Sequence, residues 1–197
     1  MGLCLSACAC YGQSLLLGVT GGARLTGDIA GNATTESKKC LLGPRVELQL
    51  PFGLGVEFDA LYSREGYSTP YQSESERANS WEFPILLKYR LAVPVVKPYV
   101  EAGYAPRVIN GSINGITPGE CAPLCIAPYP FHTTTDWSAS QGLVLGGGVE
   151  IGVRSLRVSP ELRFTRWNNA AIDVAAGGFH STQDQVDLLV GIAWKAH

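Results

Sequence analysis

The sequence is poor in charged residues and contains no long apolar run. Of its 197 residues 16% are charged, well below the usual share, and Lys+Arg 15 against Asp+Glu 17 give a net charge of −2. This balance lacks the basic footprint of nucleic-acid binding, so we expect no nucleic-acid partner. No stretch approaches the roughly 18 consecutive apolar residues of a transmembrane helix, which excludes that class. The length suits one domain.

Glycine is abundant, with 23 residues, and hydrophobic residues make up 46% of the chain. This mixture favours many short strands joined by tight turns over a helical protein. A β-barrel membrane protein remains open, because its strands carry only an alternating pattern instead of a long apolar run.

Residues 1–13, MGLCLSACACYGQ, are small and apolar and precede the first strand pattern. Residues 7–9, ACA, resemble the A-x-A cleavage site of a secretory signal, although the basic n-region is missing. We interpret residues 1–13 as a signal-peptide remnant and residues 14–197 as a single domain. The alternative is a lipoprotein signal, because residues 5–8, LSAC, resemble a lipobox that would lipidate Cys8.

Two cysteines, Cys121 and Cys125, lie in the proline-rich segment GECAPLCIAP. A C-x-x-x-C pair can form half of a metal site, but no second Cys/His pair at zinc-ligand spacing accompanies it, and we read His132 as a loop histidine. We favour a disulfide in a loop exposed outside the cytoplasm, which leaves Cys40 without an obvious partner. We expect no metal and no other cofactor.

Strict alternation of apolar and polar residues is the dominant pattern, and residues 81–91, WEFPILLKYRL, show it best. As a strand, this segment has one wholly apolar face, whereas its other face carries Glu82, Lys88 and Arg90. Seven further segments alternate in the same way: residues 14–27, 41–50, 54–62, 97–108, 141–153, 156–167 and 185–194. Eight strands of about ten residues have the number and length of a small transmembrane β-barrel.

The connections between these segments alternate between long and short. The short ones are PFG, AVPVV and RS, and the longest is the segment 108–140. In an antiparallel up-and-down barrel this order places all long loops at one end and all tight turns at the other. Outer-membrane barrels show that asymmetry, with long extracellular loops and short periplasmic turns. We therefore predict an all-β, eight-stranded antiparallel transmembrane barrel.

The charged residues inside the strand segments share one parity, and the opposite parity carries charge only at strand ends. Eight acids and seven bases can pair within an eight-stranded barrel, whose interior is just wide enough for side chains to fill it. We predict that they form a charge network in the lumen and that the apolar face meets lipid. The network residues are Arg24, Arg45, Glu47, Glu57, Asp59, Glu82, Lys88, Arg90, Glu101, Arg107, Glu150, Arg157, Glu161, Arg163 and Asp187.

Aromatic residues gather toward the strand ends, where a membrane barrel meets the two bilayer interfaces. We predict two aromatic girdles. Their residues are Tyr62, Trp81, Phe164 and Trp167 at the long-loop end, with Tyr89 and Trp194 at the turn end.

These patterns resemble the small eight-stranded outer-membrane barrels of Gram-negative bacteria, the group that includes OmpA-like transmembrane domains and OmpX-like proteins. The resemblance covers residues 14–194 and rests on phrases such as GPRVELQLPFGLGVEFDALY, SWEFPILLKYRL, KPYVEAGY and DLLVGIAW. It implies a non-enzymatic protein of the bacterial outer membrane, in contact with outer-membrane lipid and with a structural or surface-interaction role. Such proteins commonly end on an aromatic residue, whereas Trp194 lies three residues before the end of this chain.

Recognition of a surface ligand or partner would then reside in the long loops, above all residues 108–140. There Tyr129, Phe131 and Trp137 are either contact groups or packing groups within the loop.

Two other function classes stay open. A soluble β-barrel with its apolar face inside would bind a small apolar ligand. A membrane-embedded lipid-modifying enzyme would need a nucleophile and base, for which His180 beside Ser181 is the nearest match, with Asp173 or Asp184 to orient the base. Adjacent strand residues point to opposite faces, so His180 could activate Ser181 only in a loop, and we expect no catalytic site. The segment LGGGVEIG lacks the Lys-Ser/Thr of a phosphate-binding loop.

Overall fold

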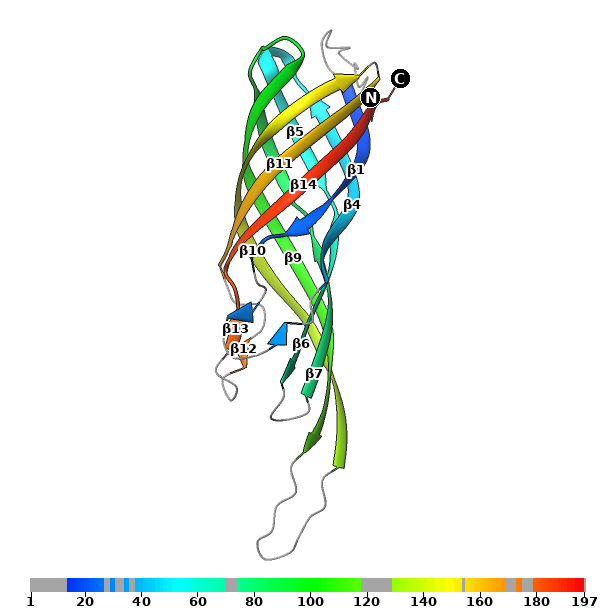
Figure 1. Ribbon diagram of the computed structural model, residues 1–197, viewed down its shortest axis with the longest axis vertical. Coiled ribbons are helices and arrows are strands. Elements are labelled where there is room, and N and C mark those ends of the chain that lie inside the picture. Colours follow the sequence, from blue (N-terminus) through cyan, green and yellow to red (C-terminus); the bar gives the residue numbers. More distant parts are fainter. Residues whose placement is uncertain are drawn as a thin grey trace, which may run out of the picture.

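The computed structural model describes residues 14–26, 29–30, 34–35, 38–69, 74–117, 129–153, 155–168, 173–174 and 179–196. These residues form a closed antiparallel β-barrel extended at one end (Figure 1). Its wall consists of β1 (Ser14–Arg24), β4 (Lys38–Gln49), β5 (Leu54–Asp59) with β6 (Leu61–Thr69), β7 (Glu74–Glu82) with β8 (Ile85–Arg90), β9 (Val96–Thr117), β10 (Tyr129–Val153), β11 (Leu156–Trp167) and β14 (Asp184–Lys195). The short elements are β2 (Ile29–Ala30), β3 (Thr34–Thr35), the 3-10 turn η1 (Pro51–Gly53), β12 (Asp173–Val174) and β13 (Phe179–Ser181).

Each wall strand pairs with its neighbour in sequence, and β1 pairs with β14 to close the barrel. Two wall strands are interrupted. β5 and β6 separate at Ala60, opposite Pro44 of β4, and β7 and β8 separate at Phe83 and Pro84. Proline cannot donate a ladder hydrogen bond, which accounts for both interruptions. Counting each interrupted pair once, the wall has eight strands, so the predicted eight-stranded barrel is confirmed.

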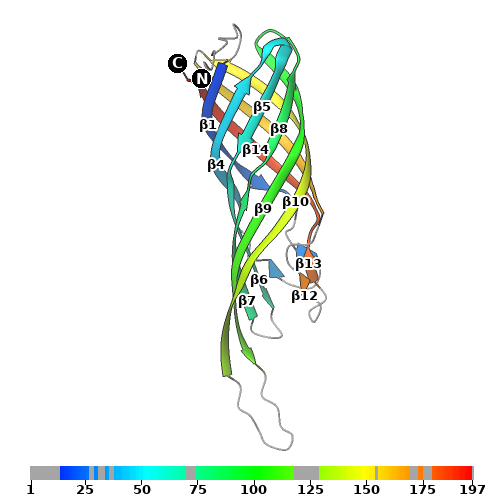
Figure 2. The ribbon, with the colours of Figure 1, turned by 180° about the vertical axis from the view of Figure 1, so that it is seen from behind.

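The two ends of the barrel differ. At the turn end, η1 joins β4 to β5, residues 91–95 join β8 to β9, β1 begins and β14 ends (Figure 2). At the opposite end, the long-loop end, strands continue past the barrel wall. The predicted difference between the two ends is therefore present. The predicted long connection between residues 62 and 81 is mostly strand, because β6 ends at Thr69 and β7 begins at Glu74.

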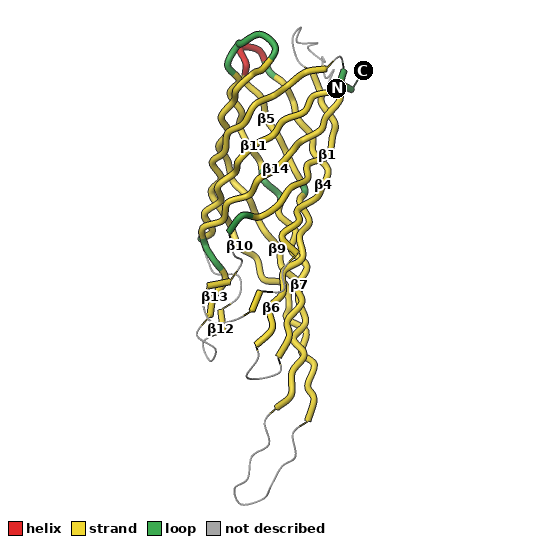
Figure 3. The backbone as a smooth tube through the Cα atoms, in the orientation of Figure 1, coloured by secondary structure: helices red, strands yellow, loops and turns green. Residues whose placement is uncertain are grey.

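The expectation that residues 108–140 form a loop is wrong, because most of the segment is strand. β9 runs to Thr117 and β10 starts at Tyr129, with His132 paired to Asn114. β6 and β7 form a second extension, and β7 also pairs with β9. The strands β6, β7, β9 and β10 thereby continue beyond the barrel wall as a projecting sheet, visible as continuous strand in Figure 3. Threonine and isoleucine along β9 and β10 favour this extended pairing.

Burial alternates along the wall strands as the sequence pattern requires. On β8, Ile85, Leu87 and Tyr89 face outward, and Leu86, Lys88 and Arg90 are buried inside. No helix among the described residues is long and apolar enough to cross a membrane. Residues 1–13, Cys121 and Cys125 lie outside the described residues, so the signal-peptide remnant and the loop disulfide stay predictions.

Candidate functional site in the barrel interior

The charged residues of the polar parity point into the barrel. Fourteen of the fifteen are buried, and Arg157, at the turn end, has a side chain that is 27% exposed. They reach the interior because each wall strand places every second side chain on its inner face. Ion pairs connect them at three levels along the barrel: a central cluster, a turn-end cluster and a group at the long-loop end.

The central cluster joins strands that are far apart in sequence. Its members are the cations Arg45, Lys88 and Arg163 and the acids Glu57, Asp59, Glu101 and Glu161. The Arg45 guanidinium bridges Asp59, at 3.2 Å, and Glu161, at 2.7 Å. Arg163 donates to Asp59 at 3.1 Å and to Glu101 at 3.1 Å. Shared partners of this kind satisfy buried charges that would otherwise be very costly.

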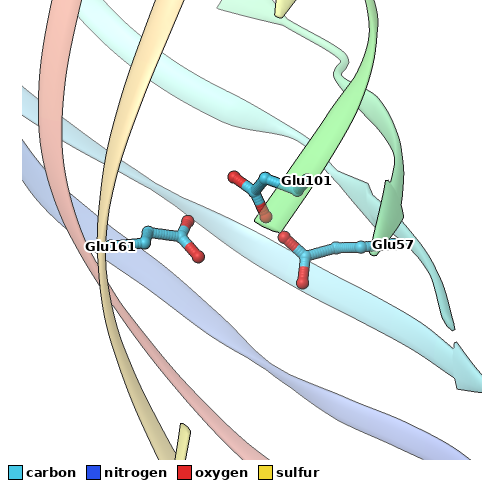
Figure 4. Close-up of side chains that lie close together, drawn as sticks. All are labelled: Glu57, Glu101 and Glu161. Carbon is cyan, nitrogen blue, oxygen red and sulfur yellow. The ribbon is translucent and has the colours of Figure 1, made fainter. Parts of the chain in front are cut away.

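Three carboxylates of this cluster converge on one point, as Figure 4 shows for Glu57, Glu101 and Glu161. One oxygen of each lies within 4.8 Å of the others, a spacing that a cation can bridge. The Lys88 ammonium already faces all three, with Nζ at 2.5 Å from Glu57, 3.3 Å from Glu101 and 3.6 Å from Glu161. Tyr99 also donates its hydroxyl to Glu161 and places its ring under Lys88 Nζ. We therefore interpret the three carboxylates as the binding site of an internal lysine.

The turn-end cluster is smaller. Arg90 pairs with Glu47 and, at 2.9 Å, with Glu150, and Arg157 pairs with the other oxygen of Glu150. These two arginines and two acids neutralise each other. The cluster lies at the turn end of the barrel interior.

The group at the long-loop end contains an aromatic residue that the sequence reasoning placed wrongly. Arg24 binds Glu82 at 2.6 Å and Asp187 at 3.2 Å. Beside them Arg107 lies 3.9 Å over the Trp167 ring and donates to Ser140.

The girdle assignment of Trp167 is wrong, because its side chain is 1% exposed and its Nε1 donates to Gln185 at 2.6 Å. Trp167 shares the parity of Glu161 and Arg163, so strand alternation places it inside. Parity was the signal that could have found it.

The other predicted girdle residues face outward. Trp81 is 41% exposed and lies 5.2 Å from the half-buried Tyr62 between ring centroids. The rings of the remaining predicted girdle residues are also exposed: Tyr89, Phe164 and Trp194.

Inward-facing glycines make room for the central cluster. A Cβ at Gly191 would collide with the Arg45 guanidinium, and one at Gly146 would meet the Glu101 carboxylate. A Cβ at Gly148 would meet the Tyr99 hydroxyl. The glycine-rich segment LGGGVEIG therefore accommodates buried side chains, a role in line with glycine in barrel strands. The sequence pattern alone does not identify these partners.

The remaining candidate residues lie outside the charged interior. Cys40 is exposed and has no disulfide partner among the described residues. His180 and Ser181 are consecutive residues of β13, which pairs with β12 and β2. His132 is exposed on the projecting sheet, and Tyr129 is exposed at its end.

Comparison with known proteins identifies the fold. No protein-family model matches the sequence, and neither does any curated protein. Among solved structures, the outer membrane protein OprG from Pseudomonas aeruginosa matches with a TM-score of 0.53 and 12% identity, covering 95% of this chain and 97% of that one. A major outer membrane protein from Thermus thermophilus matches with a TM-score of 0.51 and 14% identity, covering 92% of this chain and 99% of that one.

The fold and the interior together define a class: a closed eight-stranded antiparallel β-barrel, apolar outside and charged inside, with the fold found in outer-membrane barrel proteins. At these identities the likeness concerns the fold alone.

Proposed function

We propose that this protein is a non-enzymatic, integral β-barrel of the bacterial outer membrane. Its lumen is closed by the charge network, and its projecting sheet engages a partner at the cell surface. A single observation supports the membrane assignment: charged side chains lie inside the barrel and apolar side chains cover its outer wall, the reverse of a soluble protein.

The outer wall is apolar around the whole barrel. Large apolar side chains are exposed on every wall strand, with examples in Val19 on β1, Leu48 on β4, Phe58 on β5, Leu87 on β8, Val100 on β9, Leu143 on β10, Leu162 on β11 and Val190 on β14. Soluble proteins rarely expose continuous apolar patches above a few hundred Å². Hydrocarbon is the solvent that suits such a wall, and a closed barrel satisfies its backbone polar groups within it.

This distribution disfavours the soluble alternative. A soluble barrel for an apolar ligand needs an apolar interior, yet the described interior carries Arg45, Lys88, Glu57 and Arg163 at its centre. It also disfavours a diffusion pore, because ion pairs bridge the interior and a water channel needs roughly sixteen strands.

The orientation follows from the connections. Outer-membrane barrels place long loops outside the cell and short turns in the periplasm. We therefore assign the projecting sheet to the cell surface and the turn end to the periplasmic side.

The projecting sheet supplies a surface for a partner. Residues 129–140 of β10 pair with β9 on one side, but pairing with β11 begins only at Gly142. Along the described residues this stretch is therefore a sheet edge. Unpaired backbone groups on an edge accept an added strand, so the partner class that fits is a protein with an extended segment.

Three measurements test the proposal. Detergent-extracted protein should migrate differently on SDS gels before and after boiling and should fractionate with outer membranes. An epitope tag inserted between residues 117 and 129 should be detected on intact cells, whereas a tag within residues 91–95 should need permeabilised cells. Identical migration in both gel lanes together with a periplasmic fraction would reject the membrane assignment, and the reverse tag pattern would reject the orientation.

A further inference from the structure

The turn end carries a pocket that is bordered by two arginines of the charge network, Arg90 and Arg157. It has a volume of about 430 Å³ and lies against the turn of residues 91–95 and the β4–β5 connection. Leu50, Leu54, Leu91 and Val93 contribute apolar walls, and Arg90, Lys97 and Arg157 contribute cationic ones. A concave, mostly apolar pocket with a few convergent polar groups is the usual form of a small-molecule site.

The charge of this pocket favours an anion. Arg90 is committed to Glu47 and Glu150. Lys97 is exposed and makes no ion pair with a described residue, and Arg157 shares Glu150 with Arg90 while part of its side chain faces solvent. The accessible charges described at the turn end are all positive: Lys97, Arg157 and Lys195. Glu47 and Glu150 are buried and paired there, so the pocket has a surplus of positive charge.

An apolar groove adjoins the pocket on the outer wall. Leu54 borders both, and the groove, about 450 Å³ in volume, continues over Leu87, Tyr89, Val100 and Leu145. Lys88 and Glu101 also border it, but their side chains are buried in the barrel.

Strand register explains why this part of the wall is hollow. Ala102 of β9 pairs with Leu87 on β8 and with Leu145 on β10. In the next cross-strand row, Gly147 of β10 pairs with Val100 of β9. Small residues between large neighbours leave a depression that runs toward the turn-end rim.

From this pairing of a cationic pocket with an apolar groove we propose that the barrel binds one anionic phospholipid at the turn end. The head-group phosphate contacts Lys97 and Arg157, and an acyl chain lies in the groove over Ala102. The cationic pocket complements the phosphate, the apolar groove complements the acyl chain, and Leu54 borders both. This lipid site rests on the proposed function, because the groove must face the membrane.

Native mass spectrometry of the full-length, detergent-extracted protein tests this inference, with phosphatidylglycerol and phosphatidylcholine as probes. The wild type should retain one phosphatidylglycerol and retain phosphatidylcholine less well. Lys97→Glu should lower phosphatidylglycerol retention by roughly tenfold or more, because it reverses a charge at the phosphate. Ala102→Leu should lower it by filling the groove.

Two matched controls separate a site from general attraction. Lys195→Glu makes the same charge change at the turn end outside the pocket, and Ala23→Leu makes the same enlargement on β1, outside the groove. Both should retain phosphatidylglycerol like the wild type. Equal losses in Lys195→Glu and Lys97→Glu, no loss in Ala102→Leu, equal retention of both lipids, or displacement of the lipid by inorganic phosphate would each overturn the proposal.

The gel shift on boiling keeps the two proposals distinguishable. If the wild type shows the shift but retains no phosphatidylglycerol, the lipid site is refuted while the membrane barrel stands. If the wild type shows no shift and a periplasmic location, the proposed function fails first.

Discussion

Lys88 Nζ lies 2.5 Å from Glu57 Oε2, although the two residues belong to strands that are separated in the chain by β6 and β7. The same ammonium faces Glu101 and Glu161 and lies 4.4 Å from the centroid of the Tyr99 ring. One lysine thus ties together β5, β8, β9 and β11. Because Lys88 and its carboxylate partners are almost wholly buried, we interpret these contacts as a structural link between the strands at the barrel centre.

Replacing Lys88 should destabilise the barrel strongly. Lys88→Met leaves three converging carboxylates with one cation fewer, and breaking a buried ion pair costs about 3–5 kcal/mol. The free energy of unfolding, measured by urea titration in lipid vesicles, should fall by that amount. Lys195→Met, an exposed lysine at the end of β14, should change it by less than about 0.5 kcal/mol. Equal small effects for both variants would show that the central cluster is not tightly coupled.

Neutralising an acid of the central cluster should cost less than removing its lysine. Four carboxylates face three cations there, so Glu101→Gln brings the cluster to charge balance. It still weakens the contacts to Lys88 and Arg163, and we expect a loss of about 1–2 kcal/mol in the same titration. A larger loss than in Lys88→Met would contradict an excess of negative charge at the barrel centre.

Glycine at position 191 should be required by the Arg45 side chain. In Gly191→Ala the new methyl group collides with the guanidinium, which Asp59 and Glu161 hold in place, so we expect a loss of about 1–3 kcal/mol. Gly152→Ala is the matched control, because a Cβ there meets no atom within 4 Å. If both variants unfold at the same urea concentration as the wild type, the packing of Arg45 against β14 is looser than described.

A charge on the outer wall distinguishes lipid from water around the barrel. Val190→Arg, in the middle of β14, should cost about 2–4 kcal/mol in a bilayer, whereas Leu156→Arg at the turn end should cost about 1 kcal/mol or less. Folding yields and urea titrations in vesicles measure both. If the wall faced water, Val190→Arg would leave the free energy of unfolding unchanged.

Tryptophan quenching should separate the interior from the wall. In variants that keep a single tryptophan, brominated lipids should quench Trp81, which is exposed on the outer wall. They should leave Trp167 almost unquenched, because its ring lies inside under Arg107. Similar quenching of the two residues would show that Trp167 faces lipid on the outer wall.

Much of the fold could be predicted from sequence because strand alternation is a local property of the backbone. Residues 81–91 alone predicted that Lys88 and Arg90 share a face with Leu86, and the structure places all three inside. The position of Trp167 near a strand end suggested the girdle, but its parity, shared with Glu161 and Arg163, places it inside. The segment 108–140 was misjudged because its length and proline-rich part suggested a loop, whereas continued pairing between β9 and β10 makes residues 108–117 and 129–140 mostly strand.

By itself, the sequence determined that eight alternating strands exist and which parity carries the charges, since side-chain direction in a strand repeats every two residues. Only the tertiary structure decided which charges meet. Arg45 reaches Glu161 and Lys88 reaches Glu101 because barrel closure and the register between strands bring them to one height. Register depends on the pairing of all strands around the barrel, so no single segment of sequence contains it.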